Sequence, residues 1–70
     1  MTVIKARDIN PHHFGHAIQV PFRSDPFVLA NYTTFLFKAP HDSLSRVDLG
    51  DARGRWTSLH ADELITVEDR

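Results

Sequence analysis

Short runs of alternating polar and apolar residues fill the second half of the chain and are separated by two turn sequences. Residues 45–49 alternate in this way, and residues 55–59 resume the alternation after a glycine- and aspartate-containing break at 50–54. Residues 60–63 interrupt the pattern again before a final apolar run at 64–67. A period of two with such turns predicts β-strands joined by tight connections. The pattern therefore predicts an all-β fold.

The first half of the chain contains three more strand-like runs and one helix-capping sequence. Residues 16–22 predict a strand, and residues 27–38, which are rich in β-branched and aromatic types, predict the longest one. Residues 3–6 fit a further short strand, and residues 23–26 predict a turn. Residues 10–15 predict a single capped helical turn, because they begin with Asn-Pro and end with glycine.

The long run at residues 27–38 has an uneven apolar face. Its odd-numbered positions are apolar at both ends and polar in the middle. This pattern predicts a strand that bends and serves two halves of a sheet, which is how small barrels close. A hairpin that turns at Asn31–Tyr32 is the alternative. A second single helical turn is predicted at residues 61–63.

The order of these elements is similar to that of the SH3-like small β-barrels, a group that includes Sm-like proteins. In that group a tight hairpin precedes the penultimate strand and one 3₁₀ turn precedes the last, and residues 50–54 and 60–63 match these pieces. Residues 4–11 and 55–67 also resemble the two ends of small proteins encoded by phages of actinobacteria. The resemblance implies a small five-stranded SH3-like barrel with one or two single-turn helices and a viral origin, but no activity.

The size and composition of the chain fit one small domain over residues 1–70. A chain of 70 residues buries a limited core, and oligomerisation commonly supplements such a core. The sequence has no cysteine, so disulfides cannot add stability. Charged residues occur too early for a signal peptide, and no apolar run reaches membrane-spanning length. We therefore expect a cytoplasmic protein without a membrane partner, in the host cytoplasm if a phage encodes it.

Five histidines raise the question of a metal site, since His13 and His16 form an H-x-x-H pair. Zinc requires three or four converging ligands, and the sequence shows no second pair of ligands and no cysteine. We therefore favour surface or helix-cap histidines, with no metal and no cofactor. His60 lies near Asp62, but no nucleophile or oxyanion-forming glycine motif accompanies them. An enzyme is consequently not expected.

Strand aromatics are the main candidates for an interaction surface. If Leu49 and Leu59 face inward, Trp56 faces outward or toward a second subunit. Trp56 and Tyr32 are therefore candidate interaction residues, because large aromatics are favoured at interfaces. The favoured function is a non-enzymatic interaction protein that acts by self-association or by binding a host protein.

A nucleic-acid-binding barrel is the alternative function. Arg53 and Arg55 flank Gly54 on the predicted hairpin, Arg46 lies on the preceding strand, and Trp56 follows. Guanidinium groups can contact phosphates, and an aromatic ring can stack on a base. The net charge of −1 and the nearby aspartates limit the positive potential, so this function ranks second.

Overall fold

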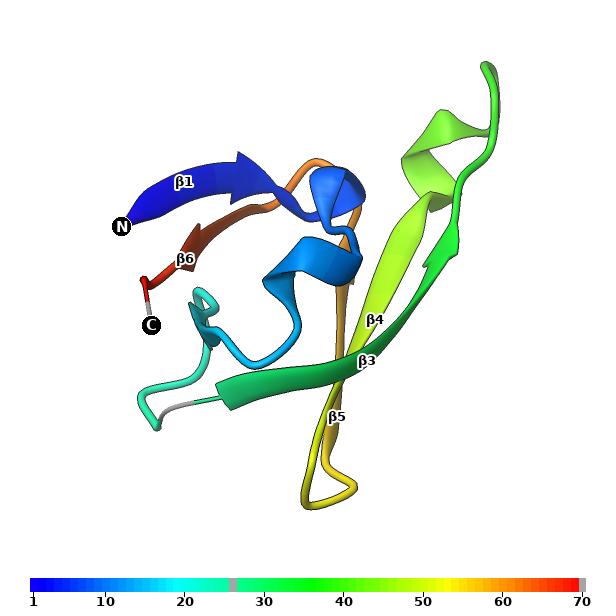
Figure 1. The fold of residues 1–70 in the computed structure, drawn as a ribbon. Coiled ribbons are helices and arrows are strands. Elements are labelled where there is room, and N and C mark those ends of the chain that lie inside the picture. The colour runs from blue at the N-terminus through cyan, green and yellow to red at the C-terminus, as the bar shows by residue number, and fades with distance from the viewer. Residues whose placement is uncertain (26, 70) are drawn as a thin grey trace.

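β-Strands provide most of the regular structure in the computed structural model, which describes residues 1–25 and 27–69 (Figure 1). In this part of the chain the strands are β1 (Thr2–Lys5), β2 (Ala17–Gln19), β3 (Phe27–Phe35), β4 (Arg46–Asp51), β5 (Trp56–His60) and β6 (Leu64–Val67). The all-β prediction is confirmed, and β6 has the predicted bounds. Of the turn predicted at residues 23–26, Pro26 lies outside the described residues. No helix in the described ranges is long and apolar enough to cross a membrane.

All strand pairs are antiparallel, and the strands form one sheet in the order β1–β6–β2–β3–β4–β5. The first and last strands of the chain pair with each other, from Thr2 opposite Val67 to Lys5 opposite Leu64. Figure 1 shows that β1 and β6 run across the view, whereas β4 and β5 run down it. The sheet therefore curves strongly around the core, and β3 connects its two halves.

The structure differs from the predicted five-stranded SH3-like barrel in strand number and in closure. It has six strands in the described residues, and the edge strands β1 and β5 do not pair with each other. The physical reason lies just after β1, where the 3₁₀ turn η1 (Ala6–Asp8) redirects the chain and buries Ala6. Two hydrogen bonds join the chain here to the β5–β6 turn, from Ala6 N–H to the Glu63 carbonyl and from Arg7 N–H to the Ala61 carbonyl. These two hydrogen bonds take the place of the strand pairing that would close the predicted barrel.

β3 bends as predicted, and the alternative hairpin at Asn31–Tyr32 is wrong. Phe27 and Val28 pair with β2, and from Leu29 onward the strand pairs with β4. A register shift between Leu29 and Asn31 marks a β-bulge. Because a bulge increases local twist and bends a strand, one strand can serve both halves of the sheet.

Helical structure in the described residues is limited to single 3₁₀ turns, η1, η2 (Pro11–His13) and η3 (Asp42–Leu44). η2 is the predicted capped turn: Asn10 Oδ1 accepts a hydrogen bond from His12 N–H at 2.9 Å, and Asn10 N–H donates to His13 Nδ1 at 3.1 Å. The tight turn predicted at residues 61–63 forms, but it is not helical. That segment is a simple turn, closed by a hydrogen bond from Glu63 N–H to the His60 carbonyl. η1 and η3 were not predicted.

The core lies on the concave side of the sheet and contains side chains from every strand except β1, whose Ile4 packs partly against it. Phe27 is the largest fully buried side chain. No buried side-chain polar atom in the described residues lacks a hydrogen-bond partner. The buried apolar residues are Ala6, Ile9, Ile18, Val20, Phe27, Leu29, Val47, Leu49, Leu59, Ala61, Ile65 and Val67.

Candidate functional site

The turn between β4 and β5 is built around one nearly buried carboxylate, that of Asp51, whose side chain is 4% exposed. Its Oδ1 accepts hydrogen bonds from the backbone N–H groups of Arg53 and Arg55, both at 2.9 Å. Gly54 has a φ of 83°, a left-handed conformation that glycine adopts without strain. An aspartate that caps its own turn and a glycine in this conformation explain why the hairpin forms here.

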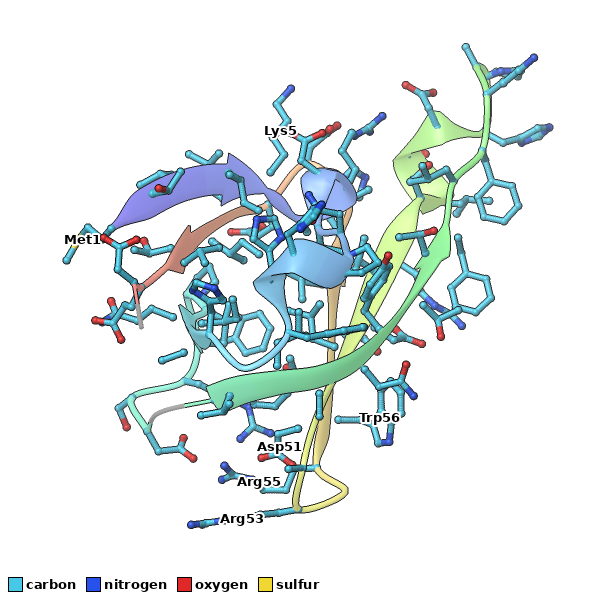
Figure 2. The ribbon with its side chains drawn as sticks, viewed as in Figure 1. Met1, Lys5, Asp51, Arg53, Arg55 and Trp56 are labelled. Carbon is cyan, nitrogen blue, oxygen red and sulfur yellow. The ribbon has the colours of Figure 1, made fainter. Side chains whose placement is uncertain are left out.

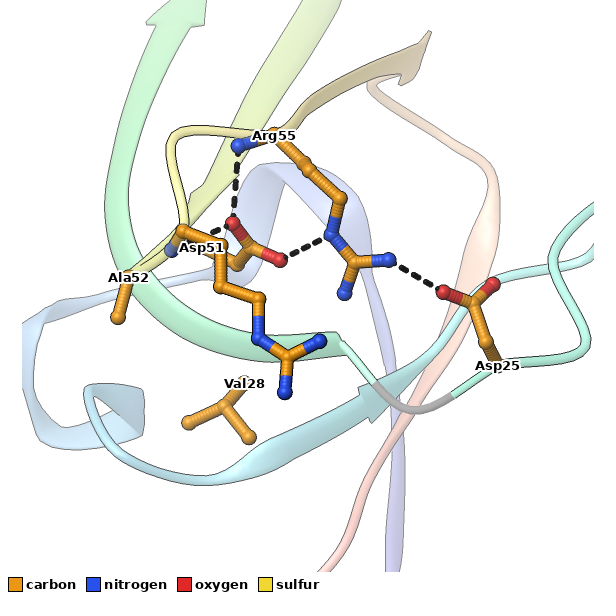
Figure 3. Close-up of a pocket in the computed structure, with 6 residues that line it drawn as sticks. Asp25, Val28, Asp51, Ala52 and Arg55 are labelled. Carbon is orange, nitrogen blue, oxygen red and sulfur yellow. Dashed lines mark hydrogen bonds and ion pairs between the residues drawn. The ribbon is translucent and has the colours of Figure 1, made fainter.

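Arg55 joins this hairpin to Asp25, which lies thirty residues earlier in the chain (Figure 3). Its Nε donates a hydrogen bond to Asp51 Oδ2 at 2.6 Å, and its Nη1 donates to Asp25 Oδ2 at 2.6 Å. The Arg23 guanidinium lies 3.7 Å from the same Asp25 oxygen. A forked guanidinium suits such a bridge, because its donors diverge in one plane. The ion pairs therefore tie the loop before β3 to the β4–β5 hairpin.

Hydrogen bonds between these residues shift the pKa values of Asp51, Asp25 and Arg55 toward the charged forms. Burial of Asp51 opposes ionisation, but hydrogen bonds from Arg55 and from the Arg53 amide outweigh it and hold the pKa of Asp51 below its ordinary value. The pKa of Asp25 is also lowered, mainly by the side-chain hydrogen bond from Arg55. The pKa of Arg55 is raised, first by its hydrogen bond to Asp51 and then by that to Asp25. The charges of Asp51 and Asp25 are thus balanced by those of Arg55 and Arg23.

Replacing Asp51 by asparagine is expected to reduce the pH dependence of folding stability. Because the pKa of Asp51 is lower in the folded state, its charged form contributes stability that is complete above the unfolded-state pKa of about 3.9 and is lost as pH falls below it. The wild type should therefore exceed Asp51→Asn in stability most at neutral pH, and the difference should shrink in acid. Urea unfolding at a series of pH values measures this difference.

Asp42→Asn is the matched control, because the Asp42 side chain is exposed and forms no ion pair with a described residue. It should leave both the stability and its pH dependence nearly unchanged. A stability difference between wild type and Asp51→Asn that stayed constant from neutral pH into acid would contradict the assigned role of the ionised carboxylate.

The ion-paired residues Asp51, Arg55 and Asp25, here called the ionic cluster, line part of an open depression of about 440 Å³ (Figure 3). Arg53 is the cation at this depression that forms no ion pair with any described residue. Its positive charge therefore remains available to a partner. The lining residues are Asp25, Val28, Asp51, Ala52, Arg53 and Arg55.

A second surface is the outer face of β3, β4 and β5, where side chains opposite one another form three rows. The strand register and the alternation of side chains define these rows. The first row lies beside the hairpin, and the last lies at the end of β5 that precedes the turn at residues 61–63. From first to last, the rows are Asn31, Gly50 and Trp56; Thr33, Asp48 and Ser58; and Phe35, Arg46 and His60.

Trp56 dominates the first row and covers Gly50 with its indole ring. A Cβ atom at position 50 would lie 3.0 Å from two indole carbons, so the absence of a side chain at Gly50 permits the ring to lie flat on the sheet. The Trp56 side chain nevertheless remains 50% exposed. The prediction that Trp56 faces outward is confirmed.

Polar contacts connect the second and third rows. Ser58 Oγ donates a hydrogen bond to Asp48 Oδ1 at 2.6 Å, and the Arg46 Nε lies 3.6 Å from the same carboxylate oxygen. The Arg46 guanidinium also lies 4.4 Å from the centre of the Phe35 ring. Arg46 thus contacts both the Asp48 carboxylate and the Phe35 ring. Because Asp48 balances the charge of Arg46, the outer face contains polar and apolar side chains but has no net positive charge.

The structure brings together only some of the residues predicted to form a site. Trp56 and Arg46 share the outer face, whereas Arg55 belongs to the ionic cluster. Figure 2 shows Arg53 and Arg55 on one side of the hairpin and Trp56 on the other. Arg55 and Trp56 are consecutive residues, so extended backbone directs their side chains to opposite sides. The arginine pair and the tryptophan therefore do not form one surface.

Tyr32 lies apart from these residues, on the inner side of β3. It is partly buried and packs against the hydrophobic core. Its ring centre lies 5.7 Å from that of Phe14, which follows η2. This placement gives Tyr32 a role in packing η2 against the sheet.

Sequence reasoning missed an exposed apolar segment that follows β3. The strand predicted to continue to residue 38 ends at Phe35, and Leu36, Phe37 and Leu44 are exposed. The buried Ser45 fixes the base of this segment, since its Oγ accepts a hydrogen bond from the Phe37 N–H at 2.9 Å. Three consecutive apolar residues at positions 35–37 break the alternation and were the available signal.

The histidines near η2 make local hydrogen bonds. His13 accepts from the Asn10 amide, which requires an unprotonated Nδ1. Burial, and then the proximity of His16 and His12, lower the pKa of His13 and favour that state. The Nδ1 of His16 lies 2.8 Å from the Glu68 carbonyl oxygen. No group of three or more histidine, aspartate or glutamate side chains among the described residues could hold a metal ion.

Comparisons with protein-family models, curated proteins and solved structures give no match to this chain. Its function is therefore inferred from the surfaces and contacts of the molecule itself.

Proposed function

We propose that this chain is a non-enzymatic interaction protein that acts by self-association. The observation that carries the proposal is the free edge strand β5, which bears the half-exposed Trp56 on its outer face. Edge strands present unpaired backbone groups that a second chain can use, and tryptophan is favoured at the centre of interfaces. A host protein could use the same edge by strand addition, and this alternative remains a prediction from the sequence.

The small size of the core supports self-association. A 70-residue chain without cysteine has neither a large core nor disulfides, and association would bury additional apolar surface. Exposed apolar side chains occur on several strands and loops, including Val3, Leu44 and Trp56. The ionic cluster of Asp51, Arg55 and Asp25 is assigned a structural role, because its hydrogen bonds define the hairpin and its attachment to the loop before β3.

Nucleic-acid binding receives less support from the charge distribution. The Arg55 charge is balanced by two aspartates, and Asp48 lies beside Arg46. Arg53 alone of these three arginines has no ion pair with a described residue. A nucleic-acid site generally requires a cluster of uncompensated basic groups. The phage origin and the SH3-like relationship stay predictions, and self-association does not depend on them.

Sedimentation velocity from low micromolar to submillimolar concentration tests the proposal. We expect the weight-average sedimentation coefficient to rise with concentration, because the association is governed by mass action. A nuclease-treated sample should give the same result, since the interaction is between protein chains. A sedimentation coefficient that stays at the monomer value over the whole range would refute self-association.

A further inference from the structure

The two edges of the sheet differ in how well they are protected against pairing. β1 has four residues and contains Lys5, and a lysine on an edge strand disfavours association. β5 has five residues and contains no lysine, acidic residue or proline. Because natural edge strands usually carry such protective residues, their absence points to β5 as the strand that pairs with another chain.

The hydrogen-bond pattern of the β4–β5 hairpin identifies which backbone groups of β5 face its free edge. Asp51 N–H donates to the Arg55 carbonyl, so residue 55 directs its backbone groups toward β4. Antiparallel strands alternate in this respect, and Thr57 therefore also faces β4. The N–H and C=O groups of Trp56, Ser58 and His60 consequently face away from the sheet. Of these, the His60 carbonyl already accepts a hydrogen bond from Glu63 N–H.

We infer that two copies of the chain pair through β5, antiparallel and with a twofold axis at Ser58. This inference rests on the proposed self-association and specifies its interface. In this register Ser58 of each copy exchanges two backbone hydrogen bonds with Ser58 of the other. The His60 N–H of each copy donates to the Trp56 carbonyl of the other, which adds two more bonds. Each contact of Trp56 in one copy with His60 in the other is repeated with the two copies exchanged, as a twofold interface requires.

The register also brings opposite charges together beyond both ends of the paired strands. With Ser58 at the centre, the hairpin turn that carries Arg53 in one copy lies near the turn after β5 that carries Glu63 in the other. Arg53 and Glu63 are exposed and form no ion pair with a described residue of their own chain. The twofold axis produces this pairing twice. This charge complementarity favours the antiparallel arrangement of two copies of this chain.

Single-cysteine cross-linking tests the register, because the natural sequence contains no cysteine. In the inferred dimer the two Ser58 Cα atoms are about 5.5 Å apart, a distance that a disulfide can span. We expect Ser58→Cys to form a disulfide-linked dimer under mild oxidation. Thr33→Cys is the matched control, since Thr33 occupies the same row but lies on β3, two strands away from the free edge. It should remain mostly monomeric on a non-reducing gel.

Charge exchange provides a second test that does not depend on Ser58, whose hydroxyl group bonds to Asp48. Arg53→Glu and Glu63→Arg should each weaken self-association about tenfold, because each creates two like-charge contacts in the symmetric dimer. Combining both substitutions in one chain should restore the wild-type dissociation constant. Lys38→Glu reverses an exposed charge outside β5 and should have little effect.

The outcomes separate this inference from the proposed function. Cross-linking at Ser58 together with rescue by the combined charge exchange supports the β5 register. A concentration-dependent dimer that shows neither cross-linking nor rescue overturns the register and leaves self-association intact. A chain that stays monomeric at every concentration overturns both.

Discussion

Phe27→Ala is expected to destabilise the folded chain by about 3–5 kcal/mol, the usual cost of removing a buried phenylalanine ring. Phe27 is 0% exposed and is the largest fully buried side chain. It also lies where β3 pairs with Ile18 of β2, next to the bulge that joins the two halves of the sheet. A domain of this size has a total stability of roughly 4–10 kcal/mol, so the substitution should remove about a third of that stability or more.

Urea unfolding followed by circular dichroism measures this loss, with Phe22→Ala as the matched control. Phe22 is an aromatic residue of the same type that is 61% exposed, and its replacement should cost less than about 1 kcal/mol. The expected result is a large separation between the two urea midpoints. Similar midpoints would mean that Phe27 is not at the centre of the core.

Trp56→Ala is expected to weaken self-association at least thirtyfold, which corresponds to about 2 kcal/mol. The Trp56 ring is supported from below by Gly50 and is half exposed, so it offers a rigid apolar surface beside the free edge. In the inferred dimer it lies opposite His60 of the second copy. Such an aromatic anchor loses little conformational entropy on binding, because the sheet already orients it.

The dissociation constants of wild type and Trp56→Ala are measured by sedimentation equilibrium. Phe22→Ala again serves as the control, since it removes an exposed aromatic ring far from β5 in the chain and should change the dissociation constant less than threefold. Unfolding curves for each variant establish that the folded monomer persists. Equal effects of the two substitutions would show that general surface hydrophobicity, and not the β5 edge, drives association.

The local patterns of the sequence determined most of the secondary structure. Alternation located β4 and β5, and the spacing of Asp51 and Gly54 located the hairpin between them. The cap formed by Asn10 before Pro11 was also predictable. These features are decided by contacts within a few residues, because side-chain alternation and turn hydrogen bonds act over that distance.

Only the tertiary structure decided how the sheet ends and which charges are compensated. The pairing of β1 with β6 joins opposite ends of the chain, and after η1 the sheet stays open between β1 and β5, whereas the sequence pattern suggested closure. Arg55 looked like a free cation in the sequence, yet Asp25 reaches it from thirty residues away. Alternation within one strand carries no information about its distant partner, so the open edge of β5 and the location of uncompensated charge emerge only when the sheet is assembled.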